Sequence, residues 1–134
     1  MSYEFSLSTE RTSLIGTETF RDHFVNSLKL SKNRIQILSG YVNINGVRWL
    51  EKQLDNKSIN VTIITQWNEQ NLIDGSCDLE SYLISKNNNW TFKILNNLHA
   101  KVAIFDDDIL YIGSGNLTGK GMALVPVSNS ELGV

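Results

Sequence analysis

The sequence predicts an α/β domain in which helices flank a mixed, mainly β-sheet. Two observations carry this prediction: strand-like and helix-like segments alternate up to Trp90, and closely spaced strand-like segments follow it. Alternation of the two periods favours parallel pairing, whereas short connections between neighbouring strands favour antiparallel pairing. We therefore expect a sheet that is partly parallel and partly antiparallel.

The first half of the chain contains two expected helices and two expected strands. From Thr17 to Leu30, three apolar residues recur at every fourth position, as in an amphipathic helix: Phe20, Phe24 and Leu28. After a loop at Asn43–Gly46, helical spacing returns at Val47, Leu50 and Leu54. The β-rich runs are Arg34–Tyr41 and Asn60–Gln66.

The second half contains one more helix and three strands. Leu79, Tyr82 and Leu83 indicate a helix that ends at the polar run Lys86–Asn89. The expected strands are Thr91–Leu95, Ala100–Phe105 and Ile109–Ile112. Between the last two strands lie three aspartates, which favour a tight turn because Asp tolerates left-handed backbone and bonds its own backbone.

Composition limits the function further. With 134 residues, of which 41% are hydrophobic, we expect one domain spanning residues 1–134. The net charge of −2 gives no chain-wide basic field. Cys77 is the only cysteine, which excludes an intrachain disulfide and, with two histidines in the chain, argues against a zinc site. Since no apolar run reaches about 20 residues, we expect a cytoplasmic protein without membrane contact.

The residues that suggest chemistry gather on the expected hairpin. On a strand, residues two apart face the same side, so His99 and Lys101 project together. A two- or three-residue turn places His99 opposite Ser114–Asn116. Gly113 and Gly115 let the backbone approach a ligand closely. The pattern thus predicts one cluster at the end of two adjacent strands.

This cluster suits a phosphodiester substrate. A neutral imidazole at His99 can attack phosphorus, while Lys101 and the amide of Asn116 donate hydrogen bonds to the nonbridging oxygens. The second ring nitrogen must then carry a proton that an acceptor holds. Glu131 is the candidate acceptor.

The spacing of these residues resembles a known signature. His99-x-Lys101, four residues, Asp106, six residues and Gly113-Ser114-x-Asn116 are similar to the HKD motif of the phospholipase D superfamily, and Asn129-Ser130-Glu131 resembles the segment that follows it. The resemblance implies that His99 is a nucleophile that forms a phosphohistidine, that Lys101, Ser114 and Asn116 bind the phosphate, and that Glu131 orients His99. For Asp106 we expect a turn-stabilising role.

The resemblance also implies a homodimer, because members of the superfamily use two motifs and this chain has one. His23 cannot supply the second, since position 25 is Val rather than Lys. The implied dimer brings two His99 side chains together across a two-fold axis. Members of the superfamily usually continue beyond this segment with another helix, so truncation at the C-terminus is a further expectation.

The function that the resemblance favours is that of the single-motif nuclease and restriction-endonuclease branch. It implies hydrolysis of DNA or another nucleic acid, without a metal or any other cofactor. Two alternatives stay open. One is a phospholipid phosphodiesterase or transphosphatidylase. The other is a non-catalytic module of a larger helicase or restriction protein that binds nucleic acid or mediates dimerisation.

Two competing interpretations are weaker. Asp106–Asp108 is an oxygen-rich run, but consecutive aspartates in a tight hairpin are more typical of turns than of Mg²⁺ or Ca²⁺ sites. The glycine-rich run 113–121 fails as a P-loop, because position 114 is Ser where GxxxxGK needs Gly, and Gly121 replaces the hydroxyl residue. We also expect the three tryptophans, Trp49, Trp67 and Trp90, to pack in or around the core.

Overall fold

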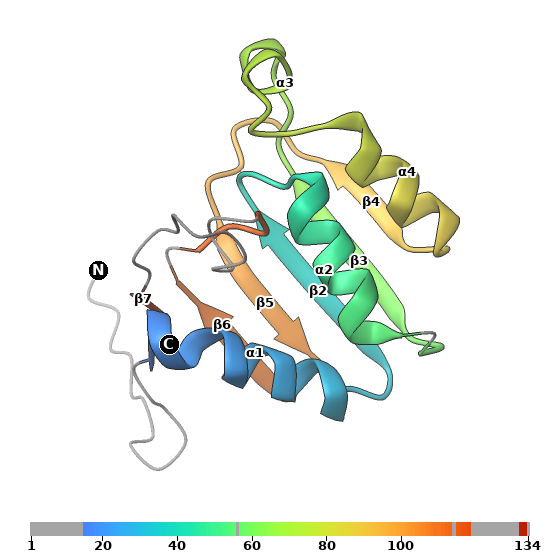
Figure 1. Cartoon of the computed structure of the whole chain (residues 1–134), viewed down its shortest axis with the longest axis vertical. Coiled ribbons are helices and arrows are strands. Elements are labelled where there is room, and N and C mark those ends of the chain that lie inside the picture. The colour runs from blue at the N-terminus through green and yellow to red at the C-terminus, as the bar shows by residue number, and fades with distance from the viewer. Residues whose placement is uncertain (1–14, 56, 114, 119–131, 134) are drawn as a thin grey trace, which may run out of the picture.

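The structure is a computed structural model that describes residues 15–55, 57–113, 115–118 and 132–133. Its helices are α1 (Thr17–Leu30), α2 (Ile44–Leu54), α3 (Glu69–Asp74) and α4 (Leu79–Asn87). Its strands are β1 (Ile15–Gly16), β2 (Arg34–Ser39), β3 (Asn60–Thr65), β4 (Thr91–Ile94), β5 (Lys101–Phe105), β6 (Ile109–Ile112) and β7 (Leu132–Gly133). Strands alternate with helical segments up to β4, with α3 and α4 both between β3 and β4, and a hairpin follows, as predicted (Figure 1).

The main sheet has five strands in the order β4-β3-β2-β5-β6. Strands β2, β3 and β4 are parallel to one another, whereas β5 is antiparallel to both β2 and β6. A separate antiparallel pair joins β1 to β7. The predicted mixture of parallel and antiparallel pairing is confirmed, as is the fold class of a mixed sheet with flanking helices.

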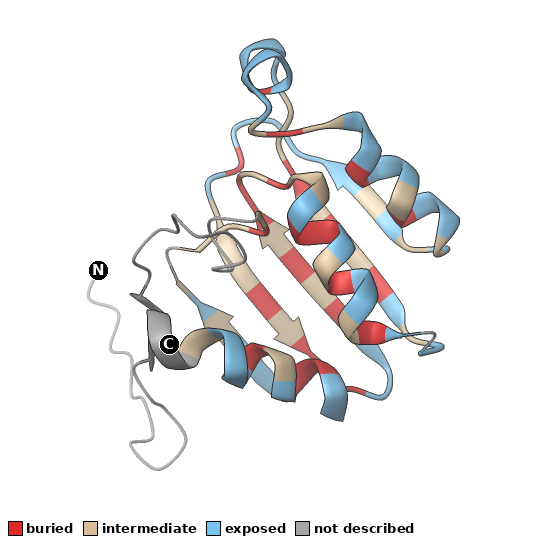
Figure 2. Ribbon diagram, in the orientation of Figure 1, coloured by how far each residue is buried: buried red, intermediate tan, exposed pale blue. Residues whose placement is uncertain are grey.

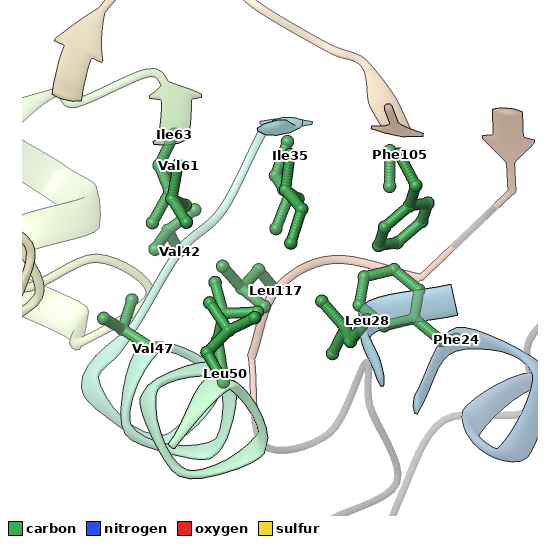
Figure 3. Packing of buried hydrophobic residues seen from close by; sticks show 13 residues of the cluster. Phe24, Leu28, Ile35, Val42, Val47, Leu50, Val61, Ile63, Phe105 and Leu117 are labelled. Carbon is green, nitrogen blue, oxygen red and sulfur yellow. The ribbon is translucent and has the colours of Figure 1, made fainter. Parts of the chain in front are cut away.

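The core lies between the sheet and the helices α1 and α2 (Figure 3). Along β2 and β3, buried residues alternate with half-buried ones, as expected where one face of a sheet packs against helices (Figure 2). The labelled core residues are Phe24, Leu28, Ile35, Val42, Val47, Leu50, Val61, Ile63, Phe105 and Leu117. In β6, Leu110 and Ile112 point to the opposite face, and each is 53% exposed.

Helix α2 begins earlier than the sequence predicts. The loop expected at Asn43–Gly46 is wrong from Ile44 onward, because Asn43 is the N-cap of the helix. Its side-chain oxygen accepts a hydrogen bond from the backbone N–H of Gly46 at 3.2 Å, which satisfies one of the free donors of the first turn. Because Asn43 and Asn45 are typical of loops, the start of this helix resembled a loop in the sequence.

Helix α4 is present as predicted, but it presents an unexpected face to the core. Leu79 and Leu83, whose spacing predicts the helix, are 60% and 53% exposed, whereas Ser81 and Ser85 are fully buried. The buried hydroxyls are satisfied within the helix: that of Ser85 donates to the carbonyl of Ser81 at 2.8 Å, and that of Ser81 donates to Asp78. Small side chains on this face let α4 approach α2, which it contacts.

Four of the expected strands need small corrections. They ran too far at Tyr41, Gln66, Leu95 and Ala100, which lie just outside the ladders. There the backbone bonds partners beyond the regular pairing, as when Leu95 donates to the carbonyl of Thr65 at 2.8 Å. Helix α3 was not predicted. It is a six-residue helix, too short to show a clear period, between an Asn68 cap and a left-handed Gly75.

The tryptophans pack largely as expected, and the cysteine is buried. Trp49 and Trp90 are partly buried against the core, and Trp67 is half-buried beside the ring of Phe92. Cys77 is 1% exposed, and burial raises the pKa of its thiol, so the thiol stays protonated at neutral pH. None of the described helices is long and apolar enough to cross a membrane.

The aspartate turn of the hairpin is tied to the start of β2. Asp106 and Asp107 adopt left-handed backbone, with φ of 54° and 63°. The Asp106 carboxylate accepts hydrogen bonds from three successive backbone N–H groups at 2.7 to 2.9 Å, those of Lys32, Asn33 and Arg34. Asp107 forms an ion pair with Arg34 at 2.6 Å. Asp106 therefore stabilises the turn and also anchors it to the neighbouring strand.

At the other end of the sheet, segment 115–118 packs directly on α2. A Cβ atom added at Gly46 would lie 2.2 Å from the backbone oxygen of Leu117 and 2.8 Å from the backbone nitrogen of Thr118. Val42 and Leu117 form a parallel bridge, and the N–H of Asn43 donates to the Leu117 carbonyl at 3.2 Å. Only glycine at position 46 leaves room for this contact.

Replacement of Asp106 by Asn should destabilise the fold at neutral pH and much less in acid. The three N–H donors lower the pKa of Asp106. A carboxyl whose pKa is lower in the folded chain than the unfolded value of about 3.9 adds stability above that value and loses it as the pH falls through the folded pKa. Urea unfolding of both proteins at about pH 7 and about pH 3 measures this effect.

Asp108→Asn is the matched control, because it removes the same charge from the same turn. Asp108 is exposed, and we expect its variant to unfold at nearly the urea concentration of the parent chain. If Asp106→Asn lowers the urea midpoint equally at both pH values, the carboxylate does not act through its charge.

Gly46→Ala should destabilise the chain by about 1–3 kcal/mol, the usual cost of overpacking a tight contact. The added methyl group meets backbone atoms, which cannot move aside by a change of rotamer. Thermal unfolding should therefore show a lower midpoint. Asn45→Ala, at the exposed neighbouring position of α2, is the control and should leave the midpoint nearly unchanged. A wild-type midpoint for Gly46→Ala would mean that segment 115–118 does not pack on α2.

Candidate active site

His99 and Lys101 lie at the end of the sheet where β2 finishes and β5 begins (Figure 1). Lys101 is the first residue of β5 and pairs with Ser39, the last residue of β2. The pairing continues by one hydrogen bond, from the N–H of Gly40 to the carbonyl of Ala100 at 2.9 Å. His99 comes just before the strand and is exposed, whereas Lys101 is half-buried. The imidazole is thus open to solvent on a backbone that the sheet holds.

Asn116 is held at the same place by its side-chain oxygen. The backbone N–H of Tyr41 donates to Asn116 Oδ1 at 3.2 Å. An N–H donor identifies the bonded amide atom as the oxygen, so Nδ2 is the part of the amide that can donate to a substrate oxygen. The contact with Tyr41 therefore fixes which end of the amide is presented.

Gly40 lies between His99 and Asn116. A Cβ atom at Gly40 would lie 3.9 Å from the Cα atom of His99 and 3.8 Å from Asn116 Oδ1. The hairpin register agrees with this arrangement, since Val102 pairs with Ile112, and three further steps bring His99 opposite residue 115. The predicted gathering of His99, Lys101 and Asn116 is therefore present in the structure.

A small hollow of about 30 Å³ lies beneath these residues. Lys101, Gly113 and Gly115 line it together with core side chains, among them Phe24 and Tyr111. It has room for only a few water molecules, which is less than a phosphodiester needs. A substrate must therefore approach from the open side, where His99 is exposed.

Sequence reasoning missed Ser39, which links the two halves of the site. Its side chain is buried, and its Oγ accepts a hydrogen bond from the N–H of Leu117 at 2.9 Å. The hydroxyl donates to the carbonyl of Tyr41 at 2.6 Å and lies 3.3 Å from Asn116 Oδ1. The sequence held a signal: Ser39 continues the core-facing alternation of Ile35 and Ile37, where a polar side chain needs a partner.

Two predicted site residues, Ser114 and Glu131, lie outside the described residues, so their roles stay predictions. The aspartate run at 106–108 belongs to the turn at the far end of the hairpin. Among the described residues, no group of three or more His, Cys, Asp or Glu side chains is arranged to hold a metal ion. Metal independence likewise stays a prediction.

Several solved structures share this fold. NucT from Helicobacter pylori is 20% identical with a TM-score of 0.63, and the match covers 90% of this chain and 81% of that one. The phospholipase D family member Nuc from Salmonella typhimurium is 19% identical with a TM-score of 0.67, covering 90% and 80%. Phosphatidylserine synthase from Haemophilus influenzae Rd KW20 is 15% identical with a TM-score of 0.70; the match covers 96% of this chain but 33% of the synthase.

At these identities the similarity shows the fold alone. No curated protein matches the chain. A family model described as cardiolipin synthase, PLD-like domain matches residues 24–134, a range that includes His99, Lys101 and Asn116. Because that match spans most of the chain, and the fold is that of the superfamily, this protein belongs to the phospholipase D-like family.

Proposed function

We propose that this chain is a metal-independent phosphodiesterase that hydrolyses DNA or another nucleic acid through a phosphohistidine on His99. The observation that carries the proposal is the arrangement at the end of β2, where exposed His99 and the backbone-held amide of Asn116 both lie close to Gly40, and Lys101 pairs with the adjoining Ser39. These three groups supply a nucleophile, a cation and a hydrogen-bond donor. They are what an in-line attack on a phosphodiester requires.

In the first step, one ring nitrogen of His99 attacks phosphorus, and the bond from phosphorus to the leaving oxygen breaks. The leaving oxygen takes a proton from His99 of the partner subunit. Lys101 and Asn116 Nδ2 donate hydrogen bonds to the nonbridging oxygens, whose negative charge they stabilise. Ser114 adds a further donor, and Glu131 holds the proton on the second ring nitrogen of the attacking His99.

In the second step, water attacks the phosphohistidine and the bond from phosphorus to nitrogen breaks. The partner's His99, now neutral, accepts the proton from that water. The products are a phosphate monoester end and a free hydroxyl end, and both imidazoles return to their starting protonation states. The partner's His99 thus acts first as the acid and then as the base, and the proton that it donates in the first step is replaced in the second.

This mechanism requires a homodimer, because the chain contains one HKD motif. A two-fold axis near His99 brings the two imidazoles to opposite sides of one phosphodiester. His99 is exposed, which leaves room for such an approach.

A nucleic acid is favoured as substrate by the resemblance of the motif to single-motif nucleases. The structural neighbours named NucT and Nuc support the same class. A phospholipid is the second candidate, supported by the fold shared with a phosphatidylserine synthase and by the family description, cardiolipin synthase. Release of labelled fragments from DNA or RNA, set beside headgroup release from phospholipid vesicles, decides between these substrates.

His99→Asn should lower cleavage of labelled DNA by at least about a thousandfold, because removal of a nucleophile eliminates the covalent step. His23→Asn is the matched control: it changes the other histidine, which is exposed on α1, and should leave the rate unchanged. Both reactions are run with a chelator.

Three results would contradict parts of this proposal. Loss of wild-type cleavage in chelator would exclude metal independence, and equal cleavage by His99→Asn would exclude the nucleophile. Mixing wild-type chains with His99→Asn chains tests the dimer. If subunits exchange, equal amounts of wild-type and His99→Asn chains should reduce activity per wild-type chain to about half, since one inactive histidine disables a shared site. Unchanged activity per wild-type chain would exclude the shared site.

Ser39→Ala should reduce the rate of cleavage about tenfold or more and affect substrate binding less, because it loosens Asn116 and Leu117 without touching the substrate. The control is Ser31→Ala, which removes another buried hydroxyl that donates to a carbonyl, at 2.6 Å. Both variants should lose about 1–3 kcal/mol of stability. If kcat falls equally in both at a temperature where both are folded, Ser39 acts on stability only.

A further inference from the structure

A second surface feature lies at the β4 edge of the sheet, away from His99. An open groove of about 350 Å³ is lined by Tyr82 and Lys86 of α4 and by Asn89, Trp90 and Phe92. Helix α4 and strand β4 run side by side at this edge (Figure 1). None of these five residues belongs to the HKD motif or to the contacts that support it.

The groove is built by the tight link between α4 and β4. Asn89 adopts left-handed backbone with φ of 59°, its N–H donates to the carbonyl of Lys86 at 3.0 Å, and the N–H of Trp90 donates to that of Ser85 at 2.9 Å. Tyr82 and Lys86 are four residues apart and thus lie on one face of the helix. The link places this face opposite Trp90 and the first residues of β4.

The aromatic rings are in contact with one another but not fully covered. The rings of Tyr82 and Phe92 are 5.9 Å apart at 74°, and those of Phe92 and Trp67 are 5.5 Å apart. Tyr82 is 39% exposed, and Phe92 and Trp90 are half-buried. Ser81 and Ser85 are buried on the neighbouring face of α4, and Tyr82 is left partly exposed in the groove.

We infer that this groove binds a base of single-stranded nucleic acid, with Tyr82 as the stacking surface and Lys86 as the contact to phosphate. Nucleic-acid bases stack on aromatic side chains whatever their sequence, and a lysine beside the rings matches the charge of the adjoining phosphate. The chain has a net charge of −2, so the attraction must be local, and Lys86 supplies it within the groove.

The position of the groove fits a strand that also reaches the active site. Phe92 pairs with Ile63, and Ile63 pairs with Ile37, two residues before Ser39. Phe92, the strand residue of the groove nearest the active-site end of the sheet, therefore lies about 10 Å across the sheet and about 7 Å along it from the end of β2, and Asn89 and Trp90, just before β4, lie farther away. A single strand several nucleotides long can span the distance from the groove to the end of β2. This inference rests on the proposed nucleic-acid substrate, but its binding test does not require cleavage.

The test measures binding of fluorescent oligothymidylate, and of an abasic strand of equal length, by anisotropy. All chains carry His99→Asn so that neither strand is cut. Tyr82→Leu should weaken oligothymidylate binding about tenfold and leave the abasic strand unaffected, because only bases stack. Tyr82→Phe keeps the ring and should bind as the parent does. Lys86→Ala should weaken both strands, whereas Lys52→Ala, at an exposed lysine of α2, should weaken neither.

Equal binding by Tyr82→Leu and Tyr82→Phe would overturn the inference, and so would equal affinity of the parent for the two strands. Sedimentation tests whether a second copy of the chain occupies the groove instead. Self-association that Tyr82→Leu abolishes, in a chain that does not bind oligothymidylate, would assign the groove to that second copy and would also overturn the inference. The proposed function fails separately. A wild-type chain that cuts no nucleic acid, but whose Tyr82 variants differ as expected, retains the groove and loses the nuclease.

Discussion

The contact between Leu117 and the end of β2 is what the candidate active site depends on. Leu117 is buried, its N–H donates to Ser39 Oγ, and its carbonyl accepts from Asn43. Burial of a leucine contributes about 1.5–3 kcal/mol and each hydrogen bond about 1 kcal/mol, so packing and polar contacts hold this segment about equally. Burial of the Leu117 side chain determines how deeply the segment packs, and the hydrogen bonds, which are directional, determine its register. Asn116 takes its position from both.

The hairpin that carries His99 is fixed at its two ends by different means. At the turn, Asp106 accepts three backbone N–H groups from the residues that lead into β2. At the open end, Lys101 pairs with Ser39, and the Asn116 amide bonds the backbone of Tyr41. Strand β2 and the residues that follow it are thus the common support, and the fixing contacts use Asn116 Oδ1 and backbone groups, whereas Asn116 Nδ2 and the side chains of His99 and Lys101 are the groups proposed to meet the substrate. Those groups can then be aligned before the substrate arrives, which lowers the cost of reaching the transition state.

The sequence predicted what depends on neighbours along the chain. The three aspartates fixed the hairpin turn, and the turn fixed the register that brings His99 opposite residue 115. The sequence did not predict the contacts between segments that are distant along the chain. Gly46 is needed because Leu117 packs against it, and Ser39 is needed because the N–H of Leu117 requires an acceptor. Neither contact leaves a pattern among residues that are close in the sequence. Helix α4 shows the same limit, since its apolar residues predicted a helix correctly while its serines turned out to face the neighbouring helix. Ser114 and Glu131 remain predictions from the motif.

The active-site geometry alone does not select a substrate. The chemistry proposed for His99, Lys101 and Asn116 acts on a phosphodiester group, which nucleic acids and phospholipids share, and neighbours named Nuc and phosphatidylserine synthase share one fold. Selection must therefore come from surfaces that meet the rest of the substrate. An acyl chain gains only from apolar area, whereas a base gains from a ring that it can lie against and from a cation near its phosphate. The α4–β4 groove offers a ring and a lysine four residues apart on one helix face, which are the two groups that the proposed contact with a nucleotide uses.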